Sequence, residues 1–600
     1  MAIDRGVSAR RTDAVLLAGL LLVVAQTVVR AVVVVPSYYS QDDFHHRYLA
    51  RELGLSAEYL VRDHNGHLEI GLNLVVWLIG RDAGLSFLPA ALSLLILQLV
   101  ASLLLLAVLR QVAGPSPWLL VPFAGYLFTP LALPVATWWA AGLEALPLQI
   151  ALLAAVQGLL RALRGGSRWW TVAAVAGHAL GLLFYEKALL VLPTLVAVLL
   201  LVEWADEPLG RRLRLLVRSR PLLPHLLLTA AYVPLYLSVV DSTASLDVDP
   251  GRALSAAGET VSRLLLPGVL GGPWTGGAEN TVFPDVGPVR ALLAGLVVLA
   301  VVGVSVRLRG ARAVQAWVLV CGYVAVDLAL VQLGRADFLD LVVRDPRYLT
   351  DALPVIAIGT CAAFARPPAE RRTTPDASAP RAPVGSAARS AAGPLAAVAA
   401  LVASSLFSTA LLAEDVQHRD SRAYVEAVLA GIDGDPAVSV LNTELPFGIN
   451  LFAEPADVRG LLRTLGEERE FDRPGTELRM FDGEGRLWPV LLLAPRLQVS
   501  GPVPGCGWPM DEGWQPLGDL PAGPELAVLQ VDYRSGEEGT LHVSVGGDRQ
   551  QLELPPGSRR ASFVVTGREG PVQARVTGAA PGAVCVEGAT VGAPWPDGAA

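Results

Sequence analysis

The densest group of reactive side chains follows the first apolar stretch of the chain. Residues 38–48 read Tyr-Tyr-Ser-Gln-Asp-Asp-Phe-His-His-Arg-Tyr and include the adjacent carboxylates Asp42 and Asp43. Two carboxylates this close repel each other, so one of them takes a proton more readily, as a general base for a hydroxyl group must. The alternative is structural: an acidic turn that caps a helix beginning near Phe44.

Two histidines lie a little further along the same loop. His64 and His67 form an H-x-x-H pattern, and with an aspartate from the loop they are candidate ligands of a divalent cation. The third ligand is not specified by the sequence, so the identity of any metal stays open. These imidazoles are also candidate substrate contacts.

Phosphate binding is the second chemistry that the sequence indicates. Lys187 is the chain's only lysine and stands beside Glu186 at the edge of an apolar stretch. Its compact ammonium suits a lipid-linked phosphate, although an ion pair with Glu186 or simple snorkelling would leave the same pattern. Arg335, Arg344 and Arg347 occupy a later loop, and their forked donors also suit phosphate oxygens.

An aromatic pair marks a further short loop. Trp138, Trp139 and Glu144 lie between two apolar stretches. Tryptophans at this position commonly anchor a helix at the membrane interface, and they also stack on sugars. We therefore include these three residues among the candidate substrate contacts.

The elements that position these residues are membrane helices. The 600 residues are 53% hydrophobic and 17% charged, with a mean hydropathy of +0.48, which excludes an ordinary soluble or disordered chain. No segment combines a basic excess with aromatics, so nucleic-acid binding is also excluded. Eleven apolar stretches predict spans at residues 14–35, 87–109, 118–135, 145–160, 169–184, 188–202, 222–240, 291–306, 314–333, 350–365 and 394–413.

Arginines in alternate short loops predict the orientation of these spans. Positive residues favour the cytoplasmic side, which places the N-terminus inside and everything after Ala413 outside, in a multi-pass protein of the cell membrane. Only residues 185–187 separate the fifth and sixth spans. If these two spans formed one helix, the residues after Ala413 would lie on the cytoplasmic side instead. Residues 366–393, rich in Pro, Ala, Ser and Arg, are expected to be a flexible cytoplasmic linker within the 1–413 membrane domain.

The tail differs from the body in charge and in pattern. Residues 1–413 carry a net charge of +5 and residues 414–600 carry −13. Periodicity predicts a small α/β segment over 414–498, and short alternating strands predict a β-sandwich over 499–600, either a structural cap or a carbohydrate-binding module. Cys506 and Cys585 are the cysteines outside the spans, and we expect them to form a disulfide in an oxidising compartment.

Together, the acidic pair, the phosphate candidates and the multi-span body resemble the GT-C glycosyltransferases. The resemblance rests on Asp42-Asp43-Phe44 through Arg47-Tyr48-Leu49-Ala50, which looks like that family's first-loop pattern. It implies a polyprenyl-phosphate sugar donor, a cell-envelope glycan, glycolipid or glycoprotein acceptor, inversion, and a base at Asp42 or Asp43, with Asp42 preferred as the first acid of the pair. The Arg-rich, Ala/Gly/Val/Leu-rich composition looks actinobacterial. The alternative is a transporter or flippase of lipid-linked sugars, or an envelope scaffold.

Overall fold

The computed structural model describes most of the 600-residue chain. The described residues are 2–82, 84–241, 249–279, 281–335, 339–365, 384–434, 438–446, 448–450, 454–523 and 526–598, without the side chains of 2–13, 340–341 and 384–391. The chain forms two compact units, Met1–Tyr39 with Leu49–Arg419, and Ser40–Tyr48 with Asp420–Ala600. The short Ser40–Tyr48 segment, which holds the acidic pair, therefore groups with the tail and not with the predicted membrane domain.

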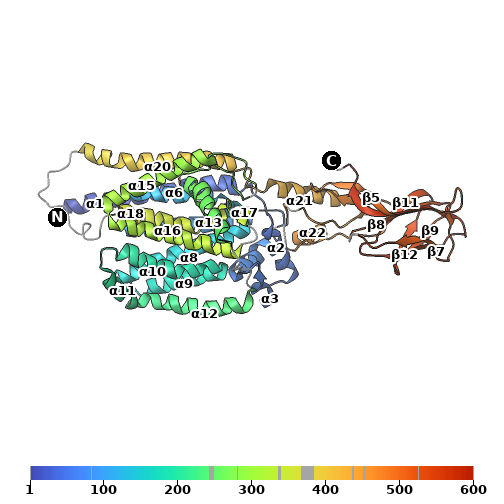
Figure 1. Ribbon diagram of the computed structural model, residues 1–600, viewed down its shortest axis with the longest axis horizontal. Coiled ribbons are helices and arrows are strands. Elements are labelled where there is room, and N and C mark those ends of the chain that lie inside the picture. The colour runs from blue at the N-terminus through green and yellow to red at the C-terminus, as the bar shows by residue number, and fades with distance from the viewer. Residues whose placement is uncertain are drawn as a thin grey trace. The chain divides into compact units, whose positions relative to one another are not determined.

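The first unit is helical. Within the described residues, seven helices are long and apolar enough to cross a membrane, or up to eight if one bent pair is a single span. The seven are α1 (Ala2–Val34), α5 (Leu88–Ala113), α8 (Trp139–Leu163), α12 (Leu223–Val239), α15 (Gly287–Arg309), α16 (Ala311–Gly334) and α20 (Val384–Leu412). The bent pair joins Pro117–Phe128 to Pro130–Thr137 at an angle of 41°. Figure 1 shows the neighbouring helices α8, α9 (Trp169–Phe184) and α10 (Val191–Val198) in this unit.

All eleven predicted spans coincide with helical segments, but several segments are short. α9 and α18 (Ala352–Phe364) have fewer residues than a straight span needs, as does the apolar helix at Ile70–Gly80. The predicted span 188–202 is composite, because η4 (Glu186–Leu190) is a 3₁₀-helix, α10 follows it, and η5 (Leu199–Glu203) is a π-helix. The membrane character of the unit is thus confirmed, whereas length and composition support seven or eight spans.

The fifth and sixth predicted spans are separate helices. Tyr185 ends α9 with an extended backbone, at φ −161° and ψ 128°, before η4 begins. One continuous helix over residues 169–202 is therefore excluded. The predicted linker lies mostly outside the described residues, and its last residues, 384–393, belong to α20.

Shorter elements connect these helices. They are α3 (Ala57–Leu60), β1 (Asp63–His64), β2 (His67–Leu68), α4 (Ile70–Val75), η1 (Val76–Gly80), η2 (Pro117–Leu119), α6 (Leu120–Phe128), η3 (Pro130–Ala132), α7 (Leu133–Thr137), α11 (Leu209–Val217), η6 (Arg220–Leu222), α13 (Pro250–Glu259), η7 (Thr260–Leu265), α14 (Leu266–Val269), α17 (Leu339–Val342) and η9 (Pro346–Leu349). Most of the candidate site residues of this unit lie on or beside these short elements.

The second unit combines three helices with two sheets. Its helices are α2 (Asp42–Glu52), which begins in the Ser40–Tyr48 segment, α21 (Arg419–Ile432) and α22 (Val458–Leu465). Its strands are β3 (Ser439–Val440), β4 (Leu478–Phe481), β5 (Leu487–Ser500), β6 (Trp508–Pro509), β7 (Gln515–Leu520), β8 (Val528–Ser535), β9 (Gly539–Val545), β10 (Asp548–Leu554), β11 (Gly557–Val564), β12 (Gly570–Thr577) and β13 (Val584–Pro596). The α/β segment and the strand-rich end agree with the fold class predicted from the sequence.

The strands form a sandwich around an apolar core. One sheet has the order β10-β9-β12-β7, and the other the order β11-β8-β13-β5-β4-β3, with β6 paired to β13. Alternate residues of both sheets, among them Val543, Val572, Val531 and Phe563, are buried in one cluster. Alternation in the sequence predicts such a core because successive side chains of a strand point to opposite faces.

The boundary predicted at residue 498 falls within strand β5 (Leu487–Ser500). β5 is one continuous strand that pairs with β4 on one side and with β13 on the other. The α/β segment and the sandwich therefore share a sheet, which a local change of composition cannot reveal. Cys506 and Cys585 form the predicted disulfide, with Cα atoms 4.9 Å apart.

Candidate functional site

Lys187 is enclosed by acceptors in the helical unit. Its side chain is 8% exposed, and its Nζ donates to Asp327 Oδ1 at 2.6 Å, to the carbonyl of Tyr348 at 3.2 Å and to Asp351 Oδ1 at 3.4 Å. An ammonium group has three protons, and these three contacts use all of them. The predicted alternative partner Glu186 contacts His67 instead.

Three elements far apart in sequence build this cluster. Lys187 comes from η4, Asp327 from α16, and Asp351 precedes α18. Tyr323, one turn before Asp327, donates its hydroxyl to Asp351 Oδ2 at 2.9 Å. Burial by itself lowers the pKa of Lys187, but the carboxylates of Asp327 and Asp351 outweigh it and hold that pKa well above its ordinary value. Lys187 therefore stays charged as the centre of a buried ion-pair network.

This arrangement bears on the predicted phosphate role of Lys187. Two carboxylates face one ammonium, so the cluster has an excess of negative charge and no spare proton on Nζ in the structure. Contact between Lys187 and a phosphate would require the exchange of one of these carboxylates. The cluster explains instead why η4 is held against α16 and α18.

His67 links Glu186 to Arg335. The strands β1 and β2 form a tight hairpin through Asn65 and Gly66, both with positive φ. His67 Nδ1 lies 2.8 Å from Glu186 Oε1, and Nε2 lies 2.9 Å from Arg335 Nη2. A guanidinium can only donate, so Nε2 accepts and the proton of the neutral ring lies on Nδ1, which donates to Glu186.

The His67 contacts respond to protonation. Burial lowers the pKa of His67, and the neighbouring carboxylates of Glu186 and Glu144 more than offset this, so the pKa is raised above its ordinary value, with Arg335 opposing. A second proton on the ring would turn Nε2 into a donor facing another donor. Protonation of His67 would therefore release Arg335, which becomes available to another acceptor.

The metal-binding reading of His64 and His67 has little support in this geometry. The register pairs the two histidines directly across the hairpin, but both ring nitrogens of His67 are used by Glu186 and Arg335. The Nε2 of His64 lies 3.3 Å from the amide nitrogen of Asn65. Within the described part of the chain, no three His, Cys, Asp or Glu side chains gather as a metal-ion site.

Arg347 is oriented by Asp345, Tyr348 and Trp138. Its Nε lies 2.7 Å from Asp345 Oδ2, and its Nη2 donates to the Tyr348 hydroxyl at 2.9 Å. The guanidinium stacks over the rings of Trp138, at 4.5 Å, and Tyr348, at 4.7 Å. Asp345 is itself fixed by the Thr281 hydroxyl at 2.8 Å. Arg347 is 26% exposed, so this oriented fork still reaches solvent.

The other two candidate arginines are less constrained. Arg344 is 34% exposed, and its Nε lies 3.9 Å from Glu259 Oε1. Arg335 reaches the hairpin through His67 and, at 3.4 Å, the carbonyl of Asn65. All three arginines belong to the helical unit and keep part of their surface accessible.

Both tryptophans of the pair are buried. Trp138 is 2% exposed and Trp139 is 1% exposed. One face of Trp138 is covered by Arg347, and the indole N–H of Trp139 donates to Ser93. Glu144 is half-buried and acts electrostatically on His67.

The acidic pair belongs to the second unit, and the two carboxylates differ. Asp43 is buried at 1% exposure, and its Oδ2 accepts the backbone N–H of Ser40 at 3.0 Å. This contact stabilises the turn before α2, which is the kind of role that the alternative of an acidic, helix-capping turn describes. Asp42 is the first residue of α2 and is half-buried. The geometry thus gives Asp43 a structural contact and leaves the preference for Asp42 as base unchanged.

Sequence reasoning missed the partners of the basic residues. Asp351, Tyr323 and Asp345 are not singled out by any local pattern, and Asp327 is an acidic residue within an apolar stretch. One signal was available. A buried lysine and an aspartate inside an apolar helix each need a counter-charge, so the only lysine and Asp327 should have been paired.

Comparisons with known proteins give structural likenesses. No protein-family profile and no curated protein sequence matches the chain. The chain is similar to the crystal structure of ArnT from Cupriavidus metallidurans bound to undecaprenyl phosphate, at 15% identity and a TM-score of 0.41, over 77% of this chain and 92% of that one.

Two further likenesses come from mycobacteria. Arabinofuranosyltransferase AftD matches at 11% identity and a TM-score of 0.33, over 95% of this chain and 58% of AftD. Arabinosyltransferase EmbB from Mycobacterium smegmatis matches at 14% identity and a TM-score of 0.31, over 96% of this chain and 64% of EmbB. In these structures undecaprenyl phosphate is the ligand bound to ArnT, and AftD and EmbB are named as an arabinofuranosyltransferase and an arabinosyltransferase.

Proposed function

We propose that this protein is a membrane glycosyltransferase that moves a sugar from a polyprenyl-phosphate donor to an acceptor of the cell envelope. The observation that carries the proposal is the partly exposed Arg347, held in one orientation by Asp345, Tyr348 and Trp138 within an apolar helical unit. Maintaining charge in such surroundings costs free energy, so an oriented, accessible guanidinium favours a functional role.

The phosphate of the donor is assigned to the arginines. Arg347 offers a planar fork that matches two phosphate oxygens, and Arg335 and Arg344 add positive charge from the same unit. Lys187 positions η4 through Asp327 and Asp351 and would bind phosphate only after exchanging one of them. The polyprenyl chain remains in the bilayer among the apolar helices.

The chemical step is a direct displacement at the anomeric carbon. The acceptor oxygen forms a bond to that carbon while the bond to the phosphate oxygen breaks, and the electron pair leaves with the phosphate. Asp42, or else Asp43, takes the proton of the acceptor hydroxyl. Attack opposite the leaving group inverts the anomeric configuration. We place this chemistry on the extracytoplasmic side, with the N-terminus inside.

A transporter or flippase of lipid-linked sugars is the second candidate. The buried Lys187–Asp327 pair and the bend between Pro117–Phe128 and Pro130–Thr137 favour it, because transporters place charges and broken helices inside the bundle. The two functions differ in product: a transporter returns the donor unchanged on the other leaflet, whereas a transferase releases polyprenyl phosphate.

One assay separates these functions. The purified full chain is incubated with a panel of radiolabelled polyprenyl-phosphate sugars and envelope glycan, glycolipid and glycoprotein acceptors, beside Asp42→Asn and the exposed control Asp82→Asn. We expect label to reach an acceptor with the wild type and with Asp82→Asn, and to be strongly reduced with Asp42→Asn. Labelled donor crossing proteoliposomes without any transfer would reject the proposal.

A further inference from the structure

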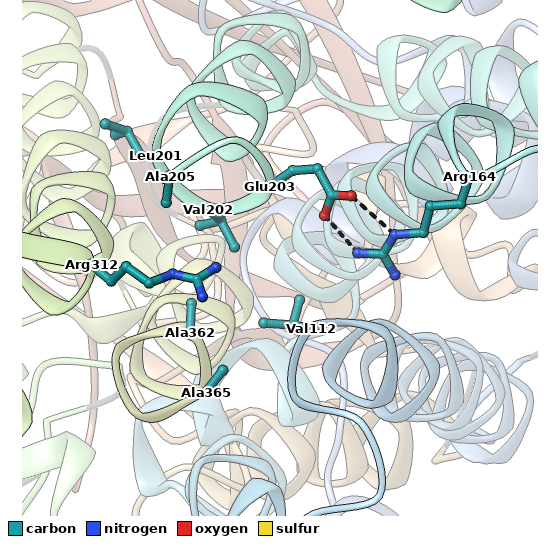
Figure 2. Close-up of a pocket in the computed structure, with 9 residues that line it drawn as sticks. All are labelled: Val112, Arg164, Leu201, Val202, Glu203, Ala205, Arg312, Ala362 and Ala365. Atoms are coloured by element: carbon teal, nitrogen blue, oxygen red, sulfur yellow. Dashed lines mark hydrogen bonds and ion pairs between the residues drawn. The ribbon is translucent and has the colours of Figure 1, made fainter. Parts of the chain in front are cut away.

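A hollow opens at the end of the helical unit away from the tryptophan pair. Its cavity volume is only about 20 Å³, the hollow being partly open to its surroundings, and Figure 2 shows Arg164, Glu203 and Arg312 around it. Trp138 and Arg164 flank opposite ends of α8, whose 25 residues span roughly 37 Å at 1.5 Å per residue. The hollow is therefore separate from the site proposed for sugar transfer.

Arg164 is neutralised within the hollow. Its Nε and Nη2 donate to the two carboxylate oxygens of Glu203 at 3.1 and 2.6 Å, and its Nη1 donates to the carbonyl of Gln111. This two-bond pairing leaves the positive charge of Arg164 compensated. Figure 2 shows both bonds on one side of the hollow.

Arg312 has an incomplete set of partners. Its side chain is 15% exposed, and its Nε lies 3.4 Å from the largely exposed carboxylate of Asp206. Its Nη1 is buried and makes no hydrogen bond to any residue that the structure describes. A buried donor on a charged group is costly unless an acceptor satisfies it. The hollow therefore presents one guanidinium N–H in need of a further acceptor.

The remaining walls are apolar. Val202, Ala362 and Ala365 line the hollow beside Arg312, and small side chains at two of these positions leave the space open. The hollow is formed at the ends of α8, η5 and α18 and the start of α16, which the arginine distribution predicts to be cytoplasmic. Basic pockets between helices at that interface suit the head group of an anionic lipid.

We propose that this hollow binds the phosphate group of an anionic phospholipid, with Arg312 as its principal ligand. The phosphate oxygens satisfy Nη1 of Arg312, and the first carbons of an acyl chain contact Val202 and Ala365. Free phosphate shares the anionic chemistry but has nothing to place against the apolar walls. Lipid bound here would hold η5, α16 and α18 together at their ends.

The test uses the full chain, purified in detergent and depleted of lipid. Binding of phosphatidylglycerol, phosphatidylcholine and inorganic phosphate is measured by native mass spectrometry, and the thermal midpoint of unfolding is recorded with each. We expect phosphatidylglycerol to bind and to raise the midpoint, with no comparable effect of the other two. Arg312→Gln should weaken phosphatidylglycerol binding at least tenfold.

Two further variants keep the result interpretable. Arg214→Gln removes an exposed arginine of α11 whose Nε contacts only its own helix, and it should change binding less than twofold. Ala365→Phe fills the hollow while keeping every charge, and it should weaken binding as Arg312→Gln does. Unchanged binding in both Arg312→Gln and Ala365→Phe, equal losses with Arg214→Gln, or equal protection by inorganic phosphate would overturn the proposal.

Discussion

Lys187 and Asp327 are 140 residues apart in the chain, yet the Nζ of one lies 2.6 Å from the Oδ1 of the other, both almost fully buried. This pair joins η4 to α16, and Asp351 extends it to α18. The only lysine of the chain thus ties three segments together.

Lys187→Met should destabilise the protein strongly. The change leaves Asp327 and Asp351 buried without their cation, and breaking a buried pair from one side typically costs about 3–5 kcal/mol. The thermal midpoint in detergent measures this, with Arg81→Met, in an exposed ion pair, as the control that stays near wild type. Lys187→Met combined with Asp327→Leu should recover part of the loss. A Lys187→Met protein as stable as wild type would show that the network contributes nothing.

Arg347→Lys should weaken binding of the polyprenyl-phosphate sugar even though the positive charge is kept. Lysine lacks the planar fork that spans Asp345 and Tyr348 and that stacks over Trp138. We expect KM for the polyprenyl-phosphate sugar to rise about tenfold, equivalent to roughly 1.4 kcal/mol. The matched control Arg263→Lys lies in an exposed ion pair with Asp285 and should behave as wild type. Equal KM values for Arg347→Lys and wild type would remove Arg347 from the donor site.

Replacing Asp42 and replacing Asp43 should have different effects on the transfer rate and on thermal stability. Asp42→Asn removes the preferred base and should lower the rate of sugar transfer roughly 10²- to 10⁴-fold with little change in thermal stability. Asp43→Asn weakens the acceptor of the Ser40 N–H and should lower thermal stability as well. Initial rates and thermal midpoints of both variants test this. Full activity in both single variants and in the double variant would exclude the acidic pair as the base.

The disulfide tests both the side of the membrane on which the C-terminal tail lies and the stability of that tail. Cys506 and Cys585 enclose a segment with a sequence separation of 79, and such a cross-link typically contributes about 2–4 kcal/mol. We expect the bond to form in cells if the tail is extracytoplasmic, as a gel-mobility shift on reduction would reveal. Cys506→Ser with Cys585→Ser should lower the melting temperature of the tail. Fully reduced thiols in freshly lysed cells would argue for a cytoplasmic tail.

His418 should make the protein acid-sensitive. Burial lowers its pKa from 6.5 to about 4, so the folded state holds the ring neutral while the unfolded state binds a proton below pH 6.5. Its contribution to stability is complete above pH 6.5 and is lost as the pH falls toward 4, by on the order of 3 kcal/mol. The pKa of His67 is raised, so its contribution to stability changes with pH in the opposite direction and is lost as the pH rises.

His418→Asn is the matched variant for this effect, because asparagine tolerates the φ of 53° found at this position. Thermal midpoints between pH 4 and 7.5 should fall less steeply for His418→Asn than for wild type. Parallel curves would show that His418 does not contribute to the acid sensitivity.

Local patterns in the sequence determined the classes of structure. Runs of apolar residues indicated the membrane helices, the break at residues 185–187 separated α9 from η4, and alternation in the tail indicated the sandwich. These features depend on side-chain spacing along one element, which the sequence displays directly. The cysteine pair followed from composition, since few other partners were available.

Tertiary structure alone decided which side chains meet. No spacing reveals that Asp351 approaches Lys187, that Trp138 lies beneath Arg347, or that Ser40–Tyr48 groups with the tail. Such contacts join segments more than a hundred residues apart, and they depend on how helices pack and where they break. The sequence by itself thus determined the membrane body, the sandwich and the residue types available for chemistry, while packing decided that its only lysine is locked between carboxylates and that an arginine presents the accessible charge.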